Sequence, residues 1–397
     1  MNKMEIQLRT LTPLWTGGVD QTFDRLHETG LIGSLRWWYE ALVRGMGGSA
    51  CDPTESKCTF EEERYRKSKA NNERQRLREA GLCDVCQLFG ATGWGRKFRL
   101  RATSEGQRLL QQNETQFLIP SGRIHQTRGG SRAGGWFVFS ESRMGEVTFE
   151  LIPLRDVDLQ PVHIVLTLIS RYASLGPKGA SGYGVIEAKN LETDLSWVNV
   201  FGDNATERNN ALPDFRDLFF AKFQFKEPAD APNWWQSISG IREAFDGKLN
   251  NNSSPRPLRK ALAELIQMHE QGILPVAPAI RNWLRYKWNH GLNHSQEQFV
   301  FGDARSAIGS KILVSYAYRT EGKRWEFRVW GWLPCKGQLS NRDSFLNSLK
   351  EVLGNDAIWK FVFVQGGIIP KMKEWHARDC SQNDGGNYLE ELLGGAP

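Results

Sequence analysis

The sequence predicts an α+β protein built from two tandem βαββαβ units of the ferredoxin-like, RRM-like kind, each with insertions. At 397 residues the chain is too long for one ordinary hydrophobic core, so two domains are the default expectation. Short segments of strict alternation, typical of half-buried strands, stand between segments with helical spacing of apolar residues. The second half repeats the order of these elements in the first half, which indicates a duplicated unit.

The first unit opens with a strand and a helix. Residues 4–11 alternate Ile6 and Leu8 with polar neighbours, and Pro13 ends the strand because proline cannot donate to a sheet ladder. Beyond a loop, residues 34–44 predict a helix, with Ser34 as its N-cap. Its apolar face is formed by Leu35, Trp38, Tyr39 and Leu42, and the opposite face by Arg36, Glu40 and Arg44.

A basic strand and a glycine-rich segment follow. Residues 97–101 alternate, so Phe98 and Leu100 are expected in the core. The opposite face carries Lys97, Arg99 and Arg101. Because three aligned cations repel each other, this face is expected to meet water or an anion. Residues 122–135 hold five glycines and predict a long mobile hairpin or loop, with the candidate contacts Arg123, His125, Arg128 and Arg132.

Residues 176–184 form a second glycine-rich loop, placed between a predicted helix and a strand. Glycines let the backbone approach phosphates, Lys178 and Ser181 add polar contacts, and Tyr183 could stack on a base. A tight turn that needs positive φ is the alternative explanation. A nucleotide P-loop is not favoured, because no Gly-Lys-Ser/Thr sequence ends a strand-to-helix turn here.

The second half repeats the first. Residues 280–286 carry Trp and Arg as residues 35–39 do, and each segment is followed by a Phe-Gly pair and an alternating strand. This repeat makes Arg281 and Arg285 candidates alongside Arg36. Residues 196–213 are polar without a period and are the predicted linker. We therefore predict an N-terminal domain over 1–195 and a C-terminal domain over 214–397.

Four of the six cysteines cluster in sequence. Cys51 and Cys58 precede a Cys-x2-Cys pair, Cys83 and Cys86, and such a pair is the usual half of a tetrahedral zinc site. We predict a structural zinc that ties down a charged insert over about 48–87; free buried thiols are the alternative. Cys335 and Cys380 have no visible partner in the sequence.

Charge and hydropathy narrow the class of protein. The net charge of +6 suits an acidic partner. No apolar segment is long enough for a signal or a membrane span, which predicts a cytoplasmic protein without a membrane partner. The aromatic RNP1 motif of ordinary RNA-recognition domains is absent, so base stacking on an open sheet is not expected.

Four motifs carry a resemblance to a known family. They are Thr-Pro-Leu-Trp-Thr-Gly-Gly at 12–18, Gly-Ser-Leu-Arg-Trp-Trp at 33–38, Cys-Asp-Val-Cys-Gln-Leu-Phe-Gly at 83–90 and the loop 176–184. Together they resemble RAMP (repeat-associated mysterious protein) sequences, and among these the large two-domain subunit of the Cmr, or type III-B CRISPR, effector. The second half has no equally specific motif.

The resemblance implies a non-catalytic RNA-binding subunit of a type III CRISPR ribonucleoprotein in antiviral defence. Its partners would be CRISPR RNA near the 3′ region, target RNA and other RAMP subunits. The predicted RNA-binding residues are Arg36, Arg44, Lys97, Arg99, Arg101, Arg123, His125, Arg128, Arg132, Lys178, Ser181, Tyr183, Arg281 and Arg285.

Two other functions stay open at this point. Asp20, Asp24 and His27 follow the first strand, where backbone RAMP subunits carry a catalytic aspartate, and His27 or His125 could act as the general base of a RAMP-type endoribonuclease. A generic single-strand RNA-binding module would share the electrostatics but lack fixed protein partners.

Overall fold

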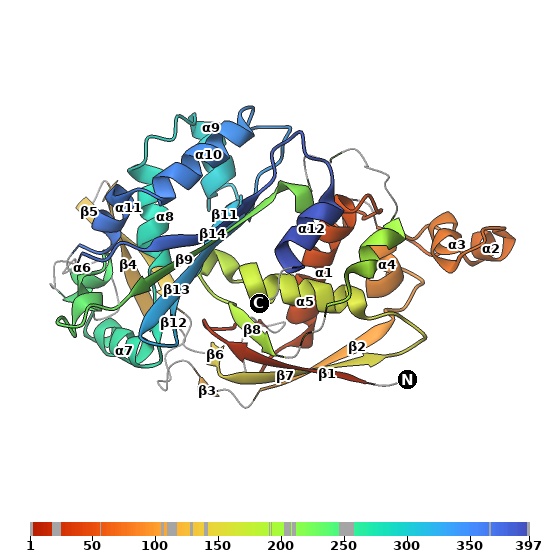
Figure 1. Cartoon of the computed structure of the whole chain (residues 1–397), viewed down its shortest axis with the longest axis horizontal. Helices are drawn as coiled ribbons and strands as arrows, with labels where there is room; N and C mark the ends of the chain where they lie inside the picture. The colour runs from red at the N-terminus through yellow and green to blue at the C-terminus, as the bar shows by residue number, and fades with distance from the viewer. Residues whose placement is uncertain are drawn as a thin grey trace.

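The computed structural model describes residues 3–17, 25–55, 57–104, 107–108, 117–127, 130–138, 142–189, 191, 193–201, 208, 212–245, 258–364 and 367–394. It is an α+β protein with two main antiparallel sheets and helices packed against them (Figure 1). No helix among these residues is long and apolar enough to cross a membrane.

The first sheet has the strand order β2-β7-β1-β8, and every pair in it is antiparallel. Its strands are β1 (Met4–Thr10), β2 (Phe98–Ser104), β7 (Glu146–Pro153) and β8 (Ile186–Lys189). The helices α1 (Glu28–Gly45) and α5 (Gln160–Tyr172) lie on one face of this sheet (Figure 1). The predicted alternation is confirmed, because Ile6, Leu8, Phe98 and Leu100 are all buried beneath these helices.

Helix α1 begins six residues before its predicted start. We predicted Ser34 as the N-cap, but His27 holds that position, and its backbone N–H donates to Thr16 Oγ1 at 2.8 Å. Ser34 lies inside the helix, where its Oγ accepts a hydrogen bond from the Gly176 N–H at 2.9 Å. The sequence alone does not show whether the Ser34 hydroxyl will accept a hydrogen bond from its own helix or from the distant Gly176 N–H.

The second sheet has the order β10-β12-β13-β9-β14, and β11 also pairs with β13. Its strands are β9 (Leu218–Lys226), β10 (Ile273–Leu274), β11 (Ile312–Val314), β12 (Ala317–Thr320), β13 (Arg324–Trp332) and β14 (Lys371–Ala377). The helices of this half are α6 (Ile241–Phe245), α7 (Leu258–Glu270), α8 (Ala277–Tyr286), α9 (His294–Phe301), α10 (Arg342–Leu353) and α11 (Asp356–Val362). Trp325 and Phe327 are buried in the core of this half, whereas Trp330 is buried in the core of the first half.

The sequence repeat corresponds to a repeated local structure. Helix α4 (Asp84–Phe89) ends at Gly90 with φ 90°, and α9 ends at Gly302 with φ 82°. Arg36 Nη1 donates to the Gly90 carbonyl at 3.3 Å, and Arg285 Nη1 donates to the Gly302 carbonyl at 2.7 Å. In each half, therefore, an arginine of the preceding long helix fixes the turn that leads into the next strand.

The buried residues form two hydrophobic cores, and the chain crosses between them: Leu218, Phe220 and Trp330 of the second sheet pack in the core of the first half. Helix α12 (Gly385–Leu393) follows the second sheet in sequence and buries Tyr388 and Leu389 in the first core. Tyr172 of α5 donates to the Leu392 carbonyl at 3.0 Å. The predicted C-terminal domain over 214–397 thus contributes its last helix to the other core. The linker at 196–213 stays a prediction.

The remaining elements are excursions from the sheets. The charged insert forms α2 (Glu62–Lys67) and α3 (Glu73–Glu79), which project from the body (Figure 1). The glycine-rich segment predicted as a hairpin or loop lies in a two-stranded sheet of β4 (Phe117–Thr127) and β5 (Gly130–Val138). Short pieces are β3 (Gln107–Arg108), β6 (Arg143–Met144), η1 (Gly179–Ser181), η2 (Leu195–Phe201), η3 (Phe215–Asp217) and η4 (Trp234–Ser237).

Candidate metal centre and nucleic-acid interface

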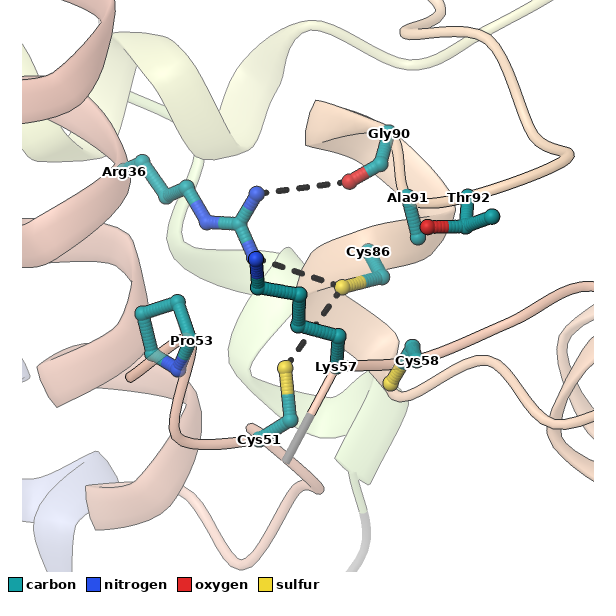
Figure 2. Close-up of a pocket in the computed structure, with 9 residues that line it drawn as sticks. All are labelled: Arg36, Cys51, Pro53, Lys57, Cys58, Cys86, Gly90, Ala91 and Thr92. Atoms are coloured by element: carbon teal, nitrogen blue, oxygen red, sulfur yellow. Dashed lines mark hydrogen bonds between the residues drawn. The ribbon is translucent and has the colours of Figure 1, made fainter. Parts of the chain in front are cut away.

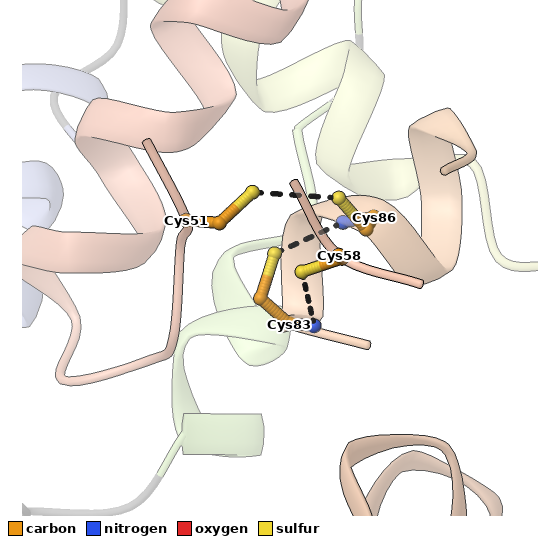
Figure 3. Close-up of side chains that lie close together, drawn as sticks. All are labelled: Cys51, Cys58, Cys83 and Cys86. Atoms are coloured by element: carbon orange, nitrogen blue, oxygen red, sulfur yellow. Dashed lines mark hydrogen bonds between the residues drawn. The ribbon is translucent and has the colours of Figure 1, made fainter. Parts of the chain in front are cut away.

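The four clustered cysteines converge at the base of the charged insert. Their sulfur atoms all lie within 4.8 Å of one another (Figure 3). One pair, Cys51 Sγ and Cys86 Sγ, is 3.6 Å apart. Four thiolates around one zinc ion at the usual Zn–S distance have their sulfur atoms about 3.8 Å apart. The cluster therefore fits a single tetrahedral ion after small side-chain movements.

The Cys-x2-Cys pair is held by the start of α4. Cys83 is the N-cap, and its Sγ accepts a hydrogen bond from the Cys86 N–H at 3.4 Å. The Cys83 N–H in turn donates to Cys58 Sγ, also at 3.4 Å. Amide donors directed at sulfur favour the thiolate form, which is the form that binds metal. The predicted metal ligands are thus brought together and supported by their own backbone.

Two cations lie beside the sulfur atoms. Arg36 Nη2 is 3.3 Å from Cys86 Sγ, and Arg36 and Lys57 both line a cavity of about 220 Å³ next to the cluster (Figure 2). Four thiolates with one divalent ion carry a net charge of −2, and two nearby cations offset it. Sequence reasoning did not single out Lys57, which has no motif around it.

The thiol groups differ in how easily they ionise. A hydrogen bond from Cys86 lowers the pKa of the Cys83 thiol to about 5, whereas burial raises the pKa of Cys51 to about 11. The pKa of Cys86 is also raised, chiefly because it donates to Cys83. One thiolate is therefore favoured at neutral pH before metal arrives, and a bound metal would displace the protons from the others.

Arg36 and Arg44 have structural partners. Arg36 Nε pairs with Glu40 at 2.9 Å, in addition to its contacts with Cys86 and Gly90. Arg44 is only 7% exposed and donates to the carbonyls of Pro213 and Cys51 at 2.9 and 3.1 Å. The prediction that Arg44 contacts RNA is wrong, because its guanidinium is turned inward. It instead fixes the segment before β9 and the first cysteine.

The basic stripe of β2 is not uniform. Arg99 and Arg101 lie exposed on the open face of the first sheet, but Arg101 is 3.9 Å from Glu150 of β7. That face also carries a carboxylate on each of the other strands of the sheet: Glu5 on β1, Glu146 on β7 and Glu187 on β8. Lys97 is half-buried with Nζ 5.8 Å from the Trp94 ring centroid, and burial lowers its pKa. The predicted groove of three aligned cations is thus a face of mixed charge.

The loop 176–184 is packed between the two halves. The Gly182 carbonyl accepts from the Tyr316 N–H at 2.9 Å, and the Gly184 N–H donates to the Pro13 carbonyl at 2.9 Å. Tyr183 is 1% exposed and makes an edge contact with Tyr316. The prediction that Tyr183 stacks on a base is wrong, because the ring fills the junction between the halves.

The outer edge of this loop remains accessible. Lys178 and Ser181 are half-exposed, and Lys178 Nζ lies 4.5 Å from the ring centroid of Trp15. Arg281 of α8 donates to the Ala180 carbonyl of the loop and to the Phe301 carbonyl. Burial and the charge of Arg285 lower the pKa of Arg281 to about 10. Lys178, Ser181 and Arg281 thus form one edge, the loop–α8 edge, to which both halves contribute.

The other candidates lie elsewhere. Arg285 pairs with Glu297 at 2.8 Å as well as with Gly302. In the β4–β5 hairpin, Arg123 and His125 lie on β4, and His125 is opposite Arg132 of β5. Three predicted residues lie outside the described residues: Arg128, Asp20 and Asp24.

Cys335 and Cys380, for which the sequence suggested no partner, form a disulfide with each other. Forty-five residues separate them in the chain. Neither residue belongs to a motif, so no local signal in the sequence could have paired them.

Comparison with known proteins gives the following. The RAMP superfamily model matches residues 7–187. Among solved structures, the chain is similar to apo Cmr1 from Pyrococcus furiosus, with 13% identity, 88% of this chain and 97% of that chain covered, and a TM-score of 0.38. A chain of the type III-B Cmr-beta complex bound to cognate target RNA and AMPPnP has 8% identity, 88% and 99% coverage, and a TM-score of 0.35.

A chain of a type IV-B CRISPR complex has 13% identity, 52% and 100% coverage, and a TM-score of 0.30. No curated protein matches the chain. The family match spans β1, α1, the cysteine cluster and α5, and ends in β8. The similarity to the RAMP superfamily thus covers the part of the chain that holds the first sheet and the cysteine cluster.

Proposed function

We propose that this chain is a non-catalytic, RNA-binding subunit of a type III CRISPR effector ribonucleoprotein. Its partners would be CRISPR RNA in its 3′ region, target RNA and other RAMP subunits in the cytoplasm. The RAMP match over residues 7–187 and the motifs at 12–18, 33–38 and 83–90 support the assignment of the first half. The assignment of the second half rests on the repeat.

We infer further that each half is a ferredoxin-like unit. In the first sheet β1 lies between β7 and β8, and in the second sheet β9 lies between β13 and β14. Along the chain, helices separate β1 from β2 and β7 from β8, and helices likewise separate β9 from β11 and β13 from β14. A central first strand flanked by the third and fourth strands is the arrangement of a split βαβ unit.

The observation that carries the RNA-binding proposal is the loop–α8 edge. Lys178 and Ser181 come from the first half and Arg281 from the second, and the Arg281 contact with Ala180 holds them together. The lowered pKa of Arg281 marks a guanidinium whose charge is disfavoured by burial and by Arg285. A phosphate placed here would offset both effects, because an anion stabilises the charged form.

RNA bound at this edge would be recognised by its backbone. The edge offers an ammonium, a hydroxyl and a guanidinium, all of which suit phosphate and ribose oxygens, whereas Tyr183 is buried and cannot stack on bases. The open face of the first sheet, with its mixed charge, is a poorer surface for a polyanion. We therefore propose that the chain positions RNA without reading its sequence.

We also propose that the cysteine cluster holds one structural zinc ion. Cys58 immediately precedes the α2–α3 insert and Cys83 follows it, so a bound ion would join both ends of the insert to Cys51 and α1. Zinc would supply folding free energy at this position and no reaction step, since four protein ligands leave no open coordination site.

The test is RNA affinity of paired variants of the full chain. A single-stranded RNA of about 40 nucleotides with a repeat-derived 5′ segment is titrated with wild type, with Lys178→Ala/Arg281→Ala and with Arg99→Ala/Arg101→Ala as the charge-matched control. We expect the first pair to weaken binding about ten-fold or more, and to lower the salt slope by about 0.7 for each phosphate that is no longer neutralised. The control pair should change both quantities little.

Two outcomes would contradict the proposal. If the control pair weakened binding and the Lys178/Arg281 pair did not, RNA would bind the open sheet instead. If the purified chain cut a repeat hairpin without other subunits, the RAMP-type endoribonuclease would be the correct function. Thermal unfolding of each variant, recorded alongside, identifies any loss of binding that comes from a damaged junction.

A further inference from the structure

The Cys335–Cys380 disulfide lies where the chain passes from the second sheet to the first core. Cys335 is between β13 and α10, and Cys380 is between β14 and α12, with their Cα atoms 5.4 Å apart. Both residues are half-buried, so neither lies fully inside a core. Neither belongs to the cysteine cluster or to the loop–α8 edge.

The two sulfur atoms have different electrostatic surroundings. Arg208 Nη1 donates to Cys335 Sγ, whereas Asp343 Oδ1 lies 3.4 Å from Cys380 Sγ. Asp343 Oδ2 also accepts from the Cys380 N–H at 2.9 Å. Each charge has a counter-ion: Asp217 for Arg208 at 2.9 Å, and Arg342 for Asp343 at 2.7 Å. The group in contact with sulfur is nevertheless a cation at Cys335 and a carboxylate at Cys380.

This difference sets the direction of thiol–disulfide exchange. An adjacent guanidinium lowers the pKa of a thiol and makes it the better leaving group, whereas an adjacent carboxylate raises the pKa. Negative charge that develops on Cys335 is therefore stabilised by Arg208. Negative charge on Cys380 would be opposed by Asp343.

The disulfide also stands among contacts that hold the segment before α12. Arg342 donates to the carbonyls of Leu333 and Arg378, one on each side of the disulfide. Arg208 Nη2 donates to the Gln382 carbonyl at 2.6 Å, and Arg216 Nη1 to the Asn383 carbonyl at 3.5 Å. The position of residues 378–383 thus depends on hydrogen bonds from Arg208, Arg216 and Arg342 and on the Cys335–Cys380 disulfide. Helix α12 begins two residues later.

We propose that Cys335–Cys380 is a thiol–disulfide exchange site whose redox state sets how firmly residues 378–393 are held to the first core. The thiolate of a small thiol attacks Cys380 Sγ; the new S–S bond forms there, the Cys335–Cys380 bond breaks, and its electron pair leaves on Cys335 beside Arg208. A second small thiolate attacks the mixed disulfide at its small-thiol sulfur and releases Cys380. Two small thiols are oxidised to their disulfide, and the cysteine pair gains two electrons and two protons.

The first experiment tests the site of attack. Oxidised wild-type protein is mixed with reduced glutathione, quenched with acid at short times, and digested for mass spectrometry of the mixed disulfides. We expect glutathione on Cys380 to exceed glutathione on Cys335 by at least about three-fold. Arg208→Gln should reduce this preference, because it removes the cation that stabilises the Cys335 thiolate as it leaves. Equal labelling, or a preference for Cys335, would overturn the direction of exchange.

The second experiment tests the consequence for α12 and needs no variant. Amide hydrogen exchange is compared between oxidised wild type and protein reduced with glutathione, with zinc content measured in both samples. We expect faster exchange over residues 385–393 after reduction and unchanged exchange in β7. Unchanged exchange in α12 would show that the arginines alone hold the segment. Two free thiols after incubation with excess glutathione disulfide would show that no exchange site exists.

Discussion

Replacing Cys83 with serine is expected to abolish zinc binding and to lower the free energy of unfolding by about 4 kcal/mol or more. A ligand present at a thousand times its dissociation constant stabilises the folded state by about 4 kcal/mol, and a serine hydroxyl does not replace a thiolate as a zinc ligand. Cys83 has a second role as the N-cap of α4, so the start of that helix should also loosen.

Elemental analysis, native mass spectrometry and urea unfolding of the whole chain measure this effect. Wild type purified without chelator should contain one zinc ion per chain, and Cys83→Ser should contain none. Cys380→Ser is the control for zinc content alone, because it also removes one sulfur atom outside the cluster and should keep its zinc; its unfolding is not compared, since it breaks the Cys335–Cys380 disulfide. A wild-type chain without stoichiometric metal would leave the cysteines as free thiols and exclude the zinc proposal.

Replacing Gly184 with alanine is expected to destabilise the protein by about 3 kcal/mol or more. Gly184 has φ +84°, and a Cβ atom built there would lie 2.0 Å from the Leu175 carbonyl oxygen. The Leu175 N–H donates to the Gly184 carbonyl at 2.8 Å, so the two backbone segments cannot move apart without losing that hydrogen bond. Left-handed strain and a backbone clash at one position add to a large effect.

The free energy of unfolding is measured in urea for Gly184→Ala and for Gly95→Ala, which is the control. A Cβ at Gly95 would meet nothing within 4 Å, so that change should alter the free energy of unfolding by less than about 0.5 kcal/mol. Similar effects of both substitutions would mean that the loop 176–184 adapts its backbone. The loop could not then hold Lys178 and Ser181 in the fixed position that RNA binding requires.

Features encoded by short spacings could be predicted from the sequence. Ile6 and Leu8 alternate with polar residues, and so do Phe98 and Leu100. This alternation identifies the buried face of each strand because neighbouring strand residues point to opposite sides. The cysteine cluster could be expected from Cys83-x2-Cys86, since the start of one helix places both sulfur atoms together. The repeat found in the sequence also has a counterpart in the contacts of Arg36 and Arg285.

The failures share a physical cause. Arg44 and Tyr183 have side chains that suit RNA, but their burial is decided by segments far away in the sequence, Pro213 for Arg44 and Tyr316 for Tyr183. The disulfide partner of Cys335 and the carboxylates opposite Arg101 are equally remote. Residue type gives the chemistry that a side chain can perform, whereas the long-range fold decides which partner uses it.

The position of α12 affects how the protein folds as it is synthesised. The apolar surface of α1 and α5 is complete once residue 172 has been made, yet Tyr388 and Leu389, which cover part of it, emerge from the ribosome more than 200 residues later. At about 5–20 residues per second, that surface stays open for roughly 10 to 40 seconds. The first core therefore stays incomplete until α12 has been synthesised, which happens after the whole second sheet.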